Sequence, residues 1–409
     1  MEYAQQELSL ISSNQLGPVI MRHAEFFAGI GAVSRGLEGN WETVWANDID
    51  PLKARVFHAN NQHKQVDYQV CDIRTLHAQD VPDVGLTSST FPCTNSSCAG
   101  DRRGLLGIKS GVVYRYISLL EEKGGAKAIP YALLENPTGL IARNQGADLR
   151  DLIQRLAAIG YGACVSVVDA KHFVPQSRPR IFIVCAPLQE MERAGHLRPL
   201  AQLTNSPNGS LYTPPIWGWM KTNEDLPLFC VLNTDLPERQ STLSDVIDLD
   251  GDGWVSKDFE KGLLAGLSGK HIETFNRLVS ADEVQIATVA RRGRTRDNGE
   301  RFNATELSCT GIAPCQRPYG GGSSRSWVLV AGNGKYAFKV ITPRESARLM
   351  GLNDNFKLPE NSKEAYQVTG DAVVPACVRW VDQNILTPIM CKTLDISATH
   401  TQHRAKRNR

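Results

Sequence analysis

A cysteine directly after a proline is the residue of this chain best suited to nucleophilic chemistry. Cys93 follows Phe91 and Pro92, close to the end of a predicted strand at 84–88. The rigid ring of Pro92 restricts the backbone that leads to Cys93, and a thiol held in this way can attack an electrophilic carbon. The feature is weak evidence alone, but four other segments supply partner groups in a fixed order along the chain.

Two of these segments place a carboxylate and two arginines at the ends of predicted strands. Glu135 ends the apolar segment 131–135, where it is either a helix N-cap or a catalytic acid. Partial burial there would raise its pKa and let it donate a proton near neutral pH. Arg178 and Arg180 precede another apolar segment and share one side by strand alternation. They could form surface ion pairs, or clamp a phosphate or a base carbonyl.

A glycine-containing turn after the first predicted strand indicates a ligand that approaches the backbone. Residues 27–31 lead from that strand into a helix and contain Gly29 and Gly31. Asp48 and Asp72 follow at the ends of the next two strands. The first could accept hydrogen bonds from ribose hydroxyls, and the second could reach an adenine amino group. Alternatively, the glycines only form a turn and the acidic residues cap helices.

Strand-like and helical segments alternate from residue 24 to about 190 and predict a parallel sheet wrapped by helices. The clearest helical pattern covers 148–159, where apolar residues recur at helical spacing. The predicted strands are 25–28, 43–47, 66–71, 84–88, 131–135, 164–168 and 180–185.

The pattern changes near residue 190, and the chain up to about 335 is rich in Gly, Pro, Ser and Asn with short, irregular strand signals. Acidic residues predominate at 224–260 and basic residues at 284–326. After this region Thr342 and Pro343 predict the start of a helix. We therefore expect a first domain at 24–190, a smaller one at 191–337, a return to the first at 338–390, an N-terminal extension at 1–23 and a basic tail at 391–409.

The composition is that of an ordinary globular protein. Of the 409 residues 42% are apolar and 22% charged, and no apolar run is long enough to span a membrane. The N-terminus lacks a secretory pattern, so the ten cysteines are expected to be reduced thiols in the cytoplasm. No two of them form a CxxC pair, which indicates that there is no metal site. A net charge of +2 excludes a uniformly basic surface but not a local basic patch.

Taken in order, these motifs resemble the DNA (cytosine-5) methyltransferases of bacteria and phages. The resemblance covers about 24–190 and 338–385, and one departure is Asp371, where the family usually has asparagine. It implies a Rossmann-like methyltransferase domain with a mostly parallel sheet, and a smaller irregular target-recognition domain. The motifs that carry it are Phe27 to Gly31, Phe91 to Cys93, Glu135 to Pro137, Gln176 to Arg180 and Tyr366 to Pro375.

The resemblance implies methyl transfer from S-adenosylmethionine to carbon 5 of a cytosine in a specific double-stranded DNA sequence, without a metal. Cys93 would attack ring carbon 6, and Glu135 would donate to ring nitrogen 3. Arg178 would help to hold the base, which must be flipped from the duplex, and Arg180 would hold the surrounding network. The residues expected to bind the cofactor, which leaves as S-adenosylhomocysteine, are Phe27, Gly29, Gly31, Asp48, Ile49, Asp72, Ile73, Pro92, Asp371 and Ala372.

Basic and glycine-rich segments are the candidates for DNA contact. The segment 100–111 suits a mobile lid that contacts phosphates, although it could be an ordinary surface loop. The basic run 291–296 could equally be a solvated face. The expected DNA contacts are Arg102, Arg103, Lys109, Ser110, Arg291, Arg292, Arg294, Ser323, Ser324 and Arg325.

Two alternatives use the same fold: a tRNA cytosine-5 methyltransferase, and a DNA-binding regulator without catalysis. The long, divergent region 190–335 disfavours the tRNA enzyme, since that branch of the family tends to have a small insert there. We expect a monomer in the cytoplasm of a bacterium, encoded by the host or by a phage, associated with the nucleoid and paired in some hosts with a cognate restriction endonuclease.

Overall fold

The computed structural model describes residues 21–92, 111–295, 299–318, 320 and 325–391. Within these ranges the chain forms two compact units. The first unit comprises the described parts of 1–168, 179–236 and 373–409, and the second comprises those of 169–178 and 237–372.

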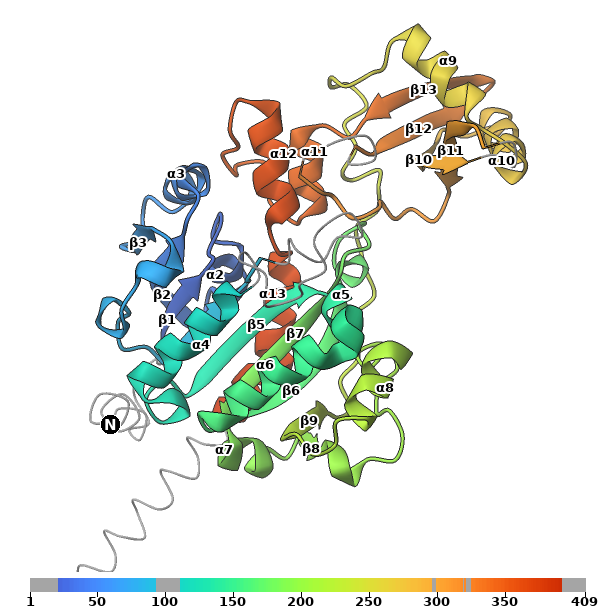
Figure 1. The fold of residues 1–409 in the computed structure, drawn as a ribbon. Helices are drawn as coiled ribbons and strands as arrows, with labels where there is room; N and C mark the ends of the chain where they lie inside the picture. The colour runs from blue at the N-terminus through green and yellow to red at the C-terminus, as the bar shows by residue number, and fades with distance from the viewer. Residues whose placement is uncertain (1–20, 93–110, 296–298, 319, 321–324, 392–409) are drawn as a thin grey trace, which may run out of the picture. The chain divides into compact units, whose positions relative to one another are not determined.

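The first unit is built on a sheet that has nine strands among the described residues, in the order β3-β2-β1-β4-β5-β7-β6-β9-β8 (Figure 1). Strands β1 to β5 pair in parallel, whereas β7 is antiparallel to β5 and β8 is antiparallel to β9. The sheet is thus mostly parallel, which confirms the predicted fold class. The strands are β1 (Met21–Phe26), β2 (Trp41–Asp48), β3 (Asp67–Val70), β4 (Leu86–Ser89), β5 (Tyr131–Pro137), β6 (Tyr161–Asp169), β7 (Pro179–Pro187), β8 (Leu197–Pro199) and β9 (Leu228–Val231).

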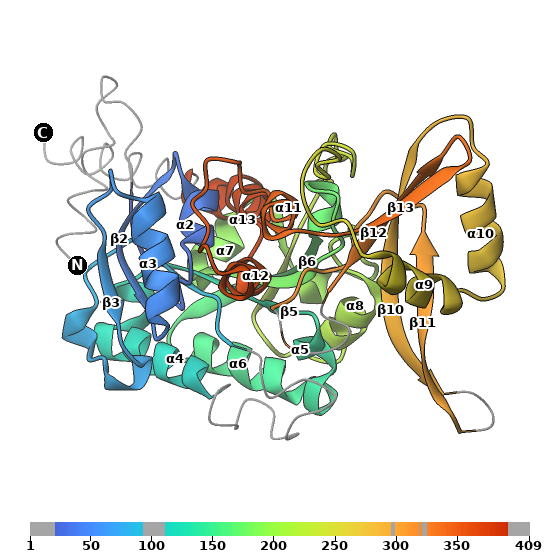
Figure 2. The ribbon, with the colours of Figure 1, turned by 90° about the horizontal axis from the view of Figure 1, so that it is seen from above.

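Helices cover both faces of this sheet, which explains why its central strands are buried along almost their whole length. Figures 1 and 2 show α4 (Val112–Lys123) and α6 (Ala147–Ala158) on one face, and α2 (Ala32–Leu37) and α13 (Pro375–Val381) on the other. The apolar positions of α6 are buried, as its helical spacing predicts. The other α-helices among the described residues of this unit are α3 (Pro51–Asn60), α5 (Gly139–Ala142), α7 (Leu188–Arg193) and α8 (Pro214–Lys221).

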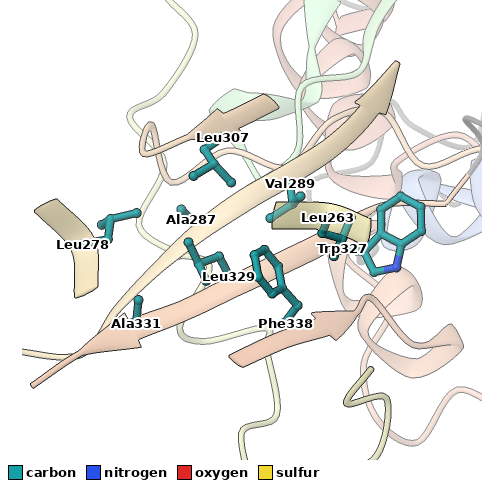
Figure 3. Packing of buried hydrophobic residues seen from close by; sticks show 9 residues of the cluster. All are labelled: Leu263, Leu278, Ala287, Val289, Leu307, Trp327, Leu329, Ala331 and Phe338. Atoms are coloured by element: carbon teal, nitrogen blue, oxygen red, sulfur yellow. The ribbon is translucent and has the colours of Figure 1, made fainter. Parts of the chain in front are cut away.

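The second unit contains a four-stranded antiparallel sheet in the order β11-β10-β12-β13. Helices α9 (Lys257–Ala265) and α10 (Lys270–Val279) contribute Leu263 and Leu278 to a buried core with Val289, Leu329 and Phe338 (Figure 3). Strand β10 is longer than the short strands that the sequence pattern indicated. The strands are β10 (Gln285–Thr295), β11 (Arg301–Ser308), β12 (Trp327–Gly332) and β13 (Lys335–Val340).

Two further helices complete the second unit, α11 (Pro343–Leu349) and α12 (Ser362–Asp371). The predicted start of α11 is confirmed, because Thr342 and Glu345 form a capping box with Pro343 in the first turn. Glu345 also pairs with Lys339 at 2.5 Å, and both side chains are 1% exposed. This buried pair fixes the helix to the end of the sheet.

Candidate functional site

The candidate motifs of the first unit meet at one edge of its sheet. Strands β1, β4 and β5 are parallel neighbours, so their carboxyl ends lie at the same edge. Strand β7 runs the other way beside β5, which brings its amino end to that edge. The turn after β1, the segment after β4, the end of β5 and the start of β7 therefore share one rim, as is usual for sites in open α/β sheets.

The turn after β1 is a tight structure in which several residues adopt the left-handed region. Phe27, Gly29 and Gly31 have φ angles of 56°, 56° and 76°. A Cβ atom at Gly31 would lie 2.6 Å from Cε2 of Phe57, so no larger residue fits there. These residues fold the backbone into a cradle at the end of the strand, where a ligand can approach the main chain.

Asp48 joins this turn to the end of β2. Its carboxylate is buried and accepts hydrogen bonds from the backbone N–H groups of Gly29 and Asp50, both at 2.9 Å. The Tyr68 hydroxyl donates to the Gly29 carbonyl at 2.9 Å from the neighbouring strand. Each carboxylate oxygen has a second lone pair to offer, and the predicted ribose contact of Asp48 stays a prediction.

The other predicted cofactor residues of this unit differ in exposure. Ile49 is 64% exposed beside the glycine turn, whereas Ile73 is buried. Asp72 caps the short helix that starts at Ile73, and its hydrogen bond with Arg74 lowers its pKa. The helix-capping alternative therefore holds for Asp72, and its contact with an adenine stays a prediction. Pro92 is the last residue described before position 111.

Two side-chain hydrogen bonds tie the segment after β4 to its neighbours. The Thr90 hydroxyl donates to the Phe27 carbonyl at 2.9 Å, and the Asn136 amide donates to the Phe91 carbonyl at 2.9 Å. Sequence reasoning assigned no role to either residue, although Asn136 directly follows Glu135. Asn136 is fully buried, and its side-chain oxygen has no hydrogen-bond partner among the described residues. The backbone that leads to Cys93 is thus fixed up to Pro92.

Five predicted residues of the following segment lie outside the described residues. They are Cys93, Arg102, Arg103, Lys109 and Ser110.

Glu135 and Arg180 form an ion pair at the same rim. Arg180 Nε lies 3.0 Å from Glu135 Oε1, and the two side chains are 14% and 10% exposed. In the β5–β7 ladder Arg180 faces Pro137 and Glu135 faces Phe182, so the pair is diagonal on one face of the sheet. Thr138, rather than Glu135, is the N-cap of α5, which rules out the N-cap alternative for that helix.

Two buried titratable residues of β1 were missed by sequence reasoning. Burial lowers the pKa of His23 to about 3, and its ring hydrogen-bonds Thr43 and Ser88 at 2.9 and 2.8 Å. Burial raises the pKa of Glu25 to about 7, although hydrogen bonds from Ser34 oppose this shift. In the sequence, only their alternation with apolar residues along β1 could have indicated that these two residues are buried.

Arg178 belongs to the second unit, where its guanidinium is almost fully buried. It donates to the carbonyls of Gln316, Gly370 and Ala372 at 2.8, 2.9 and 2.7 Å and contacts Cys315 Sγ at 3.1 Å. A planar fork of donors suits this use. Arg178 thus joins the segment 315–316 to the end of α12, and its predicted contact with a base stays a prediction.

The end of α12 carries the two predicted cofactor residues of this unit. Asp371 is the last residue of the helix and is exposed, and Ala372 follows it. A Cβ atom at Gly370 would lie 2.3 Å from the backbone N of Pro318, so a glycine is required there. Their predicted contact with the cofactor stays a prediction.

The predicted DNA-contacting arginines of β10 lie on both faces of the strand. Arg291 packs its guanidinium over the Phe259 ring at 5.5 Å. On the opposite face Arg292 and Arg294 both pair with Glu306 of β11, at 2.8 and 2.6 Å. A cleft of about 370 Å³ is lined by these three arginines together with Arg325. Ser323 and Ser324 lie outside the described residues.

Neither a metal site nor a membrane-spanning helix is found in the part of the chain that the structure describes. No group of three or more His, Cys, Asp or Glu residues there is arranged to hold a metal ion. No described helix is long and apolar enough to cross a bilayer.

Comparisons with known proteins place these motifs in a family. The family described as C-5 cytosine-specific DNA methylase matches residues 21–387. The Type II methyltransferase M.Bsp6I of Bacillus sp. is 35% identical over 40% of this chain, and the match spans only about half (52%) of that relative. The Type II methyltransferase M.NlaX of Neisseria lactamica is 25% identical over 88% of this chain and 95% of its own length.

Solved structures show the same fold. The Dnmt2 methyltransferase of S. pombe has a TM-score of 0.53 at 14% identity, over 90% of this chain and 99% of that chain. A putative DNA modification methyltransferase from an E. coli prophage has a TM-score of 0.52 at 15% identity, with the same coverage. These likenesses support the arrangement of strands and helices alone.

Proposed function

The chain belongs to the C-5 cytosine-specific DNA methylase family, and on that premise we propose that it methylates carbon 5 of cytosine in a specific double-stranded DNA sequence. The observation that carries the proposal is the largely buried ion pair of Glu135 and Arg180 at the rim where β4 ends and the segment with Phe91 and Pro92 begins. S-adenosylmethionine is the proposed methyl donor.

The turn after β1 fits that cofactor. Positive φ angles open the backbone at Phe27, Gly29 and Gly31, exposed Ile49 offers an apolar surface, and Asp48 retains lone pairs for a hydroxyl. Bound there, S-adenosylmethionine would supply an electrophilic methyl group. The protein's contribution is to bind and orient the cofactor with backbone groups that are already fixed.

Cys93 is the proposed nucleophile. Its thiolate would add to ring carbon 6 of a flipped cytosine, and the electrons released into the ring would make carbon 5 reactive toward the methyl group. Loss of the proton at carbon 5 to a base would then expel the thiolate and restore the aromatic ring. The described backbone that leads toward Cys93 is held by the hydrogen bonds at Thr90 and Phe91.

Glu135 is proposed to hold the opposite edge of the base. The contact of Arg180 Nε with Glu135 Oε1 at 3.0 Å fixes the orientation of this carboxyl group. A carboxyl in this setting can donate a proton toward ring nitrogen 3 when a base enters and can accept a bond from the amino group. Arg180 is therefore proposed as the residue that positions Glu135.

The second unit is proposed to recognise the target sequence. Its arginine-lined cleft suits the phosphate backbone and guanine edges of DNA. The buried contacts of Arg178 favour a bracing role within this unit, which would keep the end of α12 and the segment 315–316 in one arrangement.

Expression in a host without cytosine methylation, followed by bisulfite sequencing, tests the proposal. We expect methylated cytosines at one short recurring sequence and none when Cys93→Ser is expressed. Transfer of methyl groups to tRNA but not to duplex DNA would support the tRNA alternative. The regulator alternative would be supported if no nucleic acid were methylated and if Cys93→Ser had the same biological effect in the host as the intact protein.

We further propose that the protein acts as a monomer in the bacterial cytoplasm at the nucleoid, with a cognate endonuclease in some hosts. The relatives' designation as Type II methyltransferases supports only the part of this proposal that concerns a restriction-modification system. A neighbouring nuclease that cuts only the unmethylated target sequence would be the expected companion.

A further inference from the structure

A single carboxylate is found among the described residues that line two arginine-rich clefts of the second unit. Two neighbouring clefts, of about 690 and 370 Å³, share the face of β10 that carries Arg292 and Arg294. Their other cationic lining residues are Lys171, Lys270, Arg291, Arg317 and Arg325. Glu306 is the only Asp or Glu among the described lining residues of the two clefts.

The position of Glu306 follows from the register of the sheet. Glu306 faces Ala290, and Arg292 faces Ala304, so Glu306 and Arg292 are diagonal neighbours on one face. Arg294 lies two residues further along on the same face. The Glu306 side chain is 26% exposed and accepts from Arg292 Nε at 2.8 Å and from Arg294 Nη2 at 2.6 Å.

This arrangement holds both guanidinium groups by one acceptor. Burial raises the pKa of Glu306, but hydrogen bonds from Arg294 and Arg292 outweigh it, so the net pKa is lowered and the group stays ionised. Each arginine keeps N–H donors that do not face Glu306. A guanidinium with one side fixed can present its remaining donors to a guanine edge in a defined direction.

A carboxylate in a groove for DNA repels phosphates, so it does not serve general affinity. We propose that Glu306 determines sequence specificity by fixing Arg292 and Arg294 for base recognition and by limiting their contacts with phosphates. This inference rests on the proposed function of the chain as a DNA methyltransferase, and it assigns Glu306 as a positioning residue.

The test compares Glu306→Gln with the intact protein. The substitution keeps size and removes one negative charge. We expect tighter binding to DNA of unrelated sequence, a salt dependence steeper by about one phosphate contact, and a target preference reduced by about tenfold or more. Binding is measured with the target duplex found by bisulfite sequencing, and with duplexes changed at one base, at two salt concentrations.

A matched control is Asp354→Asn, which removes another carboxylate paired with an arginine in the same unit. Asp354 pairs with Arg348 at 2.7 Å and lines neither cleft. It should leave preference and salt dependence unchanged. Glu306→Asp, which keeps the charge, should restore part of the preference, and thermal unfolding of each variant checks that the fold is kept.

The outcomes separate two failures. If the intact protein methylates no DNA, the proposed function fails. If it methylates a defined sequence, and Glu306→Gln keeps the same preference and the same salt dependence, the role of Glu306 is overturned. If Glu306→Gln weakened the binding of all DNA sequences equally, the role of Glu306 would also be overturned, because that result would indicate that its ion pairs with Arg292 and Arg294 are purely structural.

Discussion

The rim of the large sheet and the face of the small sheet use the same pair of residue types in different ways. At the rim Arg180 and Glu135 are almost buried and belong to adjacent strands of a covered sheet. On the small sheet Arg292, Arg294 and Glu306 are partly exposed. Buried pairs fix geometry and are costly to break, whereas exposed pairs add little stability and are free to respond to a ligand. We therefore expect changes at the rim to abolish the reaction and changes on the small sheet to redirect it.

The largest effect is expected from Glu135→Gln. Loss of the titratable group should lower the rate constant of methyl transfer by about 10²- to 10⁴-fold, while S-adenosylmethionine binding stays within about twofold. Single-turnover kinetics and calorimetry measure the two quantities. Glu42→Gln, at an exposed position of β2, is the control. If Glu135→Gln transferred methyl groups at a near-normal rate, the expected difference between the rim of the large sheet and the face of the small sheet would be contradicted.

Arg178→Ala is expected to act mainly on stability. It removes the Arg178 donor from three carbonyls, two of them buried, so the free energy of unfolding should fall by about 2–4 kcal/mol. Urea denaturation followed by tryptophan fluorescence measures it, and exposed Arg277→Ala serves as control. If methylation were lost while stability stayed normal, Arg178 would hold the base, as the sequence resemblance implied.

Arg180→Lys should preserve charge but lose the oriented contact with Glu135. We expect a rate reduction of about 10- to 100-fold, the range for a hydrogen bond to a charged group. Combined with Glu135→Gln, the second change should cost almost nothing further, because the two residues act as one unit. Fully additive losses in this double-mutant cycle would show that Arg180 acts independently of Glu135.

The last prediction concerns how the stability of the protein changes with pH through two buried residues of β1, and it involves no change in the reaction itself. Glu25 has a pKa of about 7 in the folded protein, above its ordinary value of 4.5, so its contribution to stability grows as pH falls from 7 to 4.5. His23, with a pKa of about 3, acts in the opposite direction below pH 6.5. Relative to the intact protein, Glu25→Gln should lose about 1.4 kcal/mol per pH unit between pH 7 and 4.5.

Urea denaturation at several pH values checks this slope. His23→Gln is the companion variant, and its difference from the intact protein should change with pH in the opposite sense. A difference between Glu25→Gln and the intact protein that does not vary with pH would mean that Glu25 ionises normally in the folded state.

The core of the large sheet could be predicted because its buried positions carry apolar residues in patterns that local sequence shows. Strand β5 was expected at 131–135 and spans Tyr131–Pro137, and α6 was expected at 148–159 and spans Ala147–Ala158. The sequence did not reveal that β7 is antiparallel to β5, since direction depends on long-range pairing. That reversal is what places Arg180 beside Glu135.

The small sheet was harder to predict from its residues. Strand β10 contains three arginines and Gly293 within its last five residues, which interrupts the apolar alternation that marks a strand. The ion pairs of Arg292 and Arg294 with Glu306 depend on the strand register, which local patterns do not specify. Hydrogen bonds such as those of Thr90 and Asn136 could not be predicted either, because a single polar residue gives no periodic pattern in the sequence.

The most direct test of the account is the mass of the protein after incubation with S-adenosylmethionine and a target duplex containing 5-fluorocytosine. Fluorine at carbon 5 cannot leave as a proton does, so the Cys93 adduct should persist. We predict a stable covalent complex of protein and DNA that is absent with Cys93→Ser. Intact protein that methylates the ordinary duplex but forms no adduct with the fluorinated one would contradict the proposed chemistry.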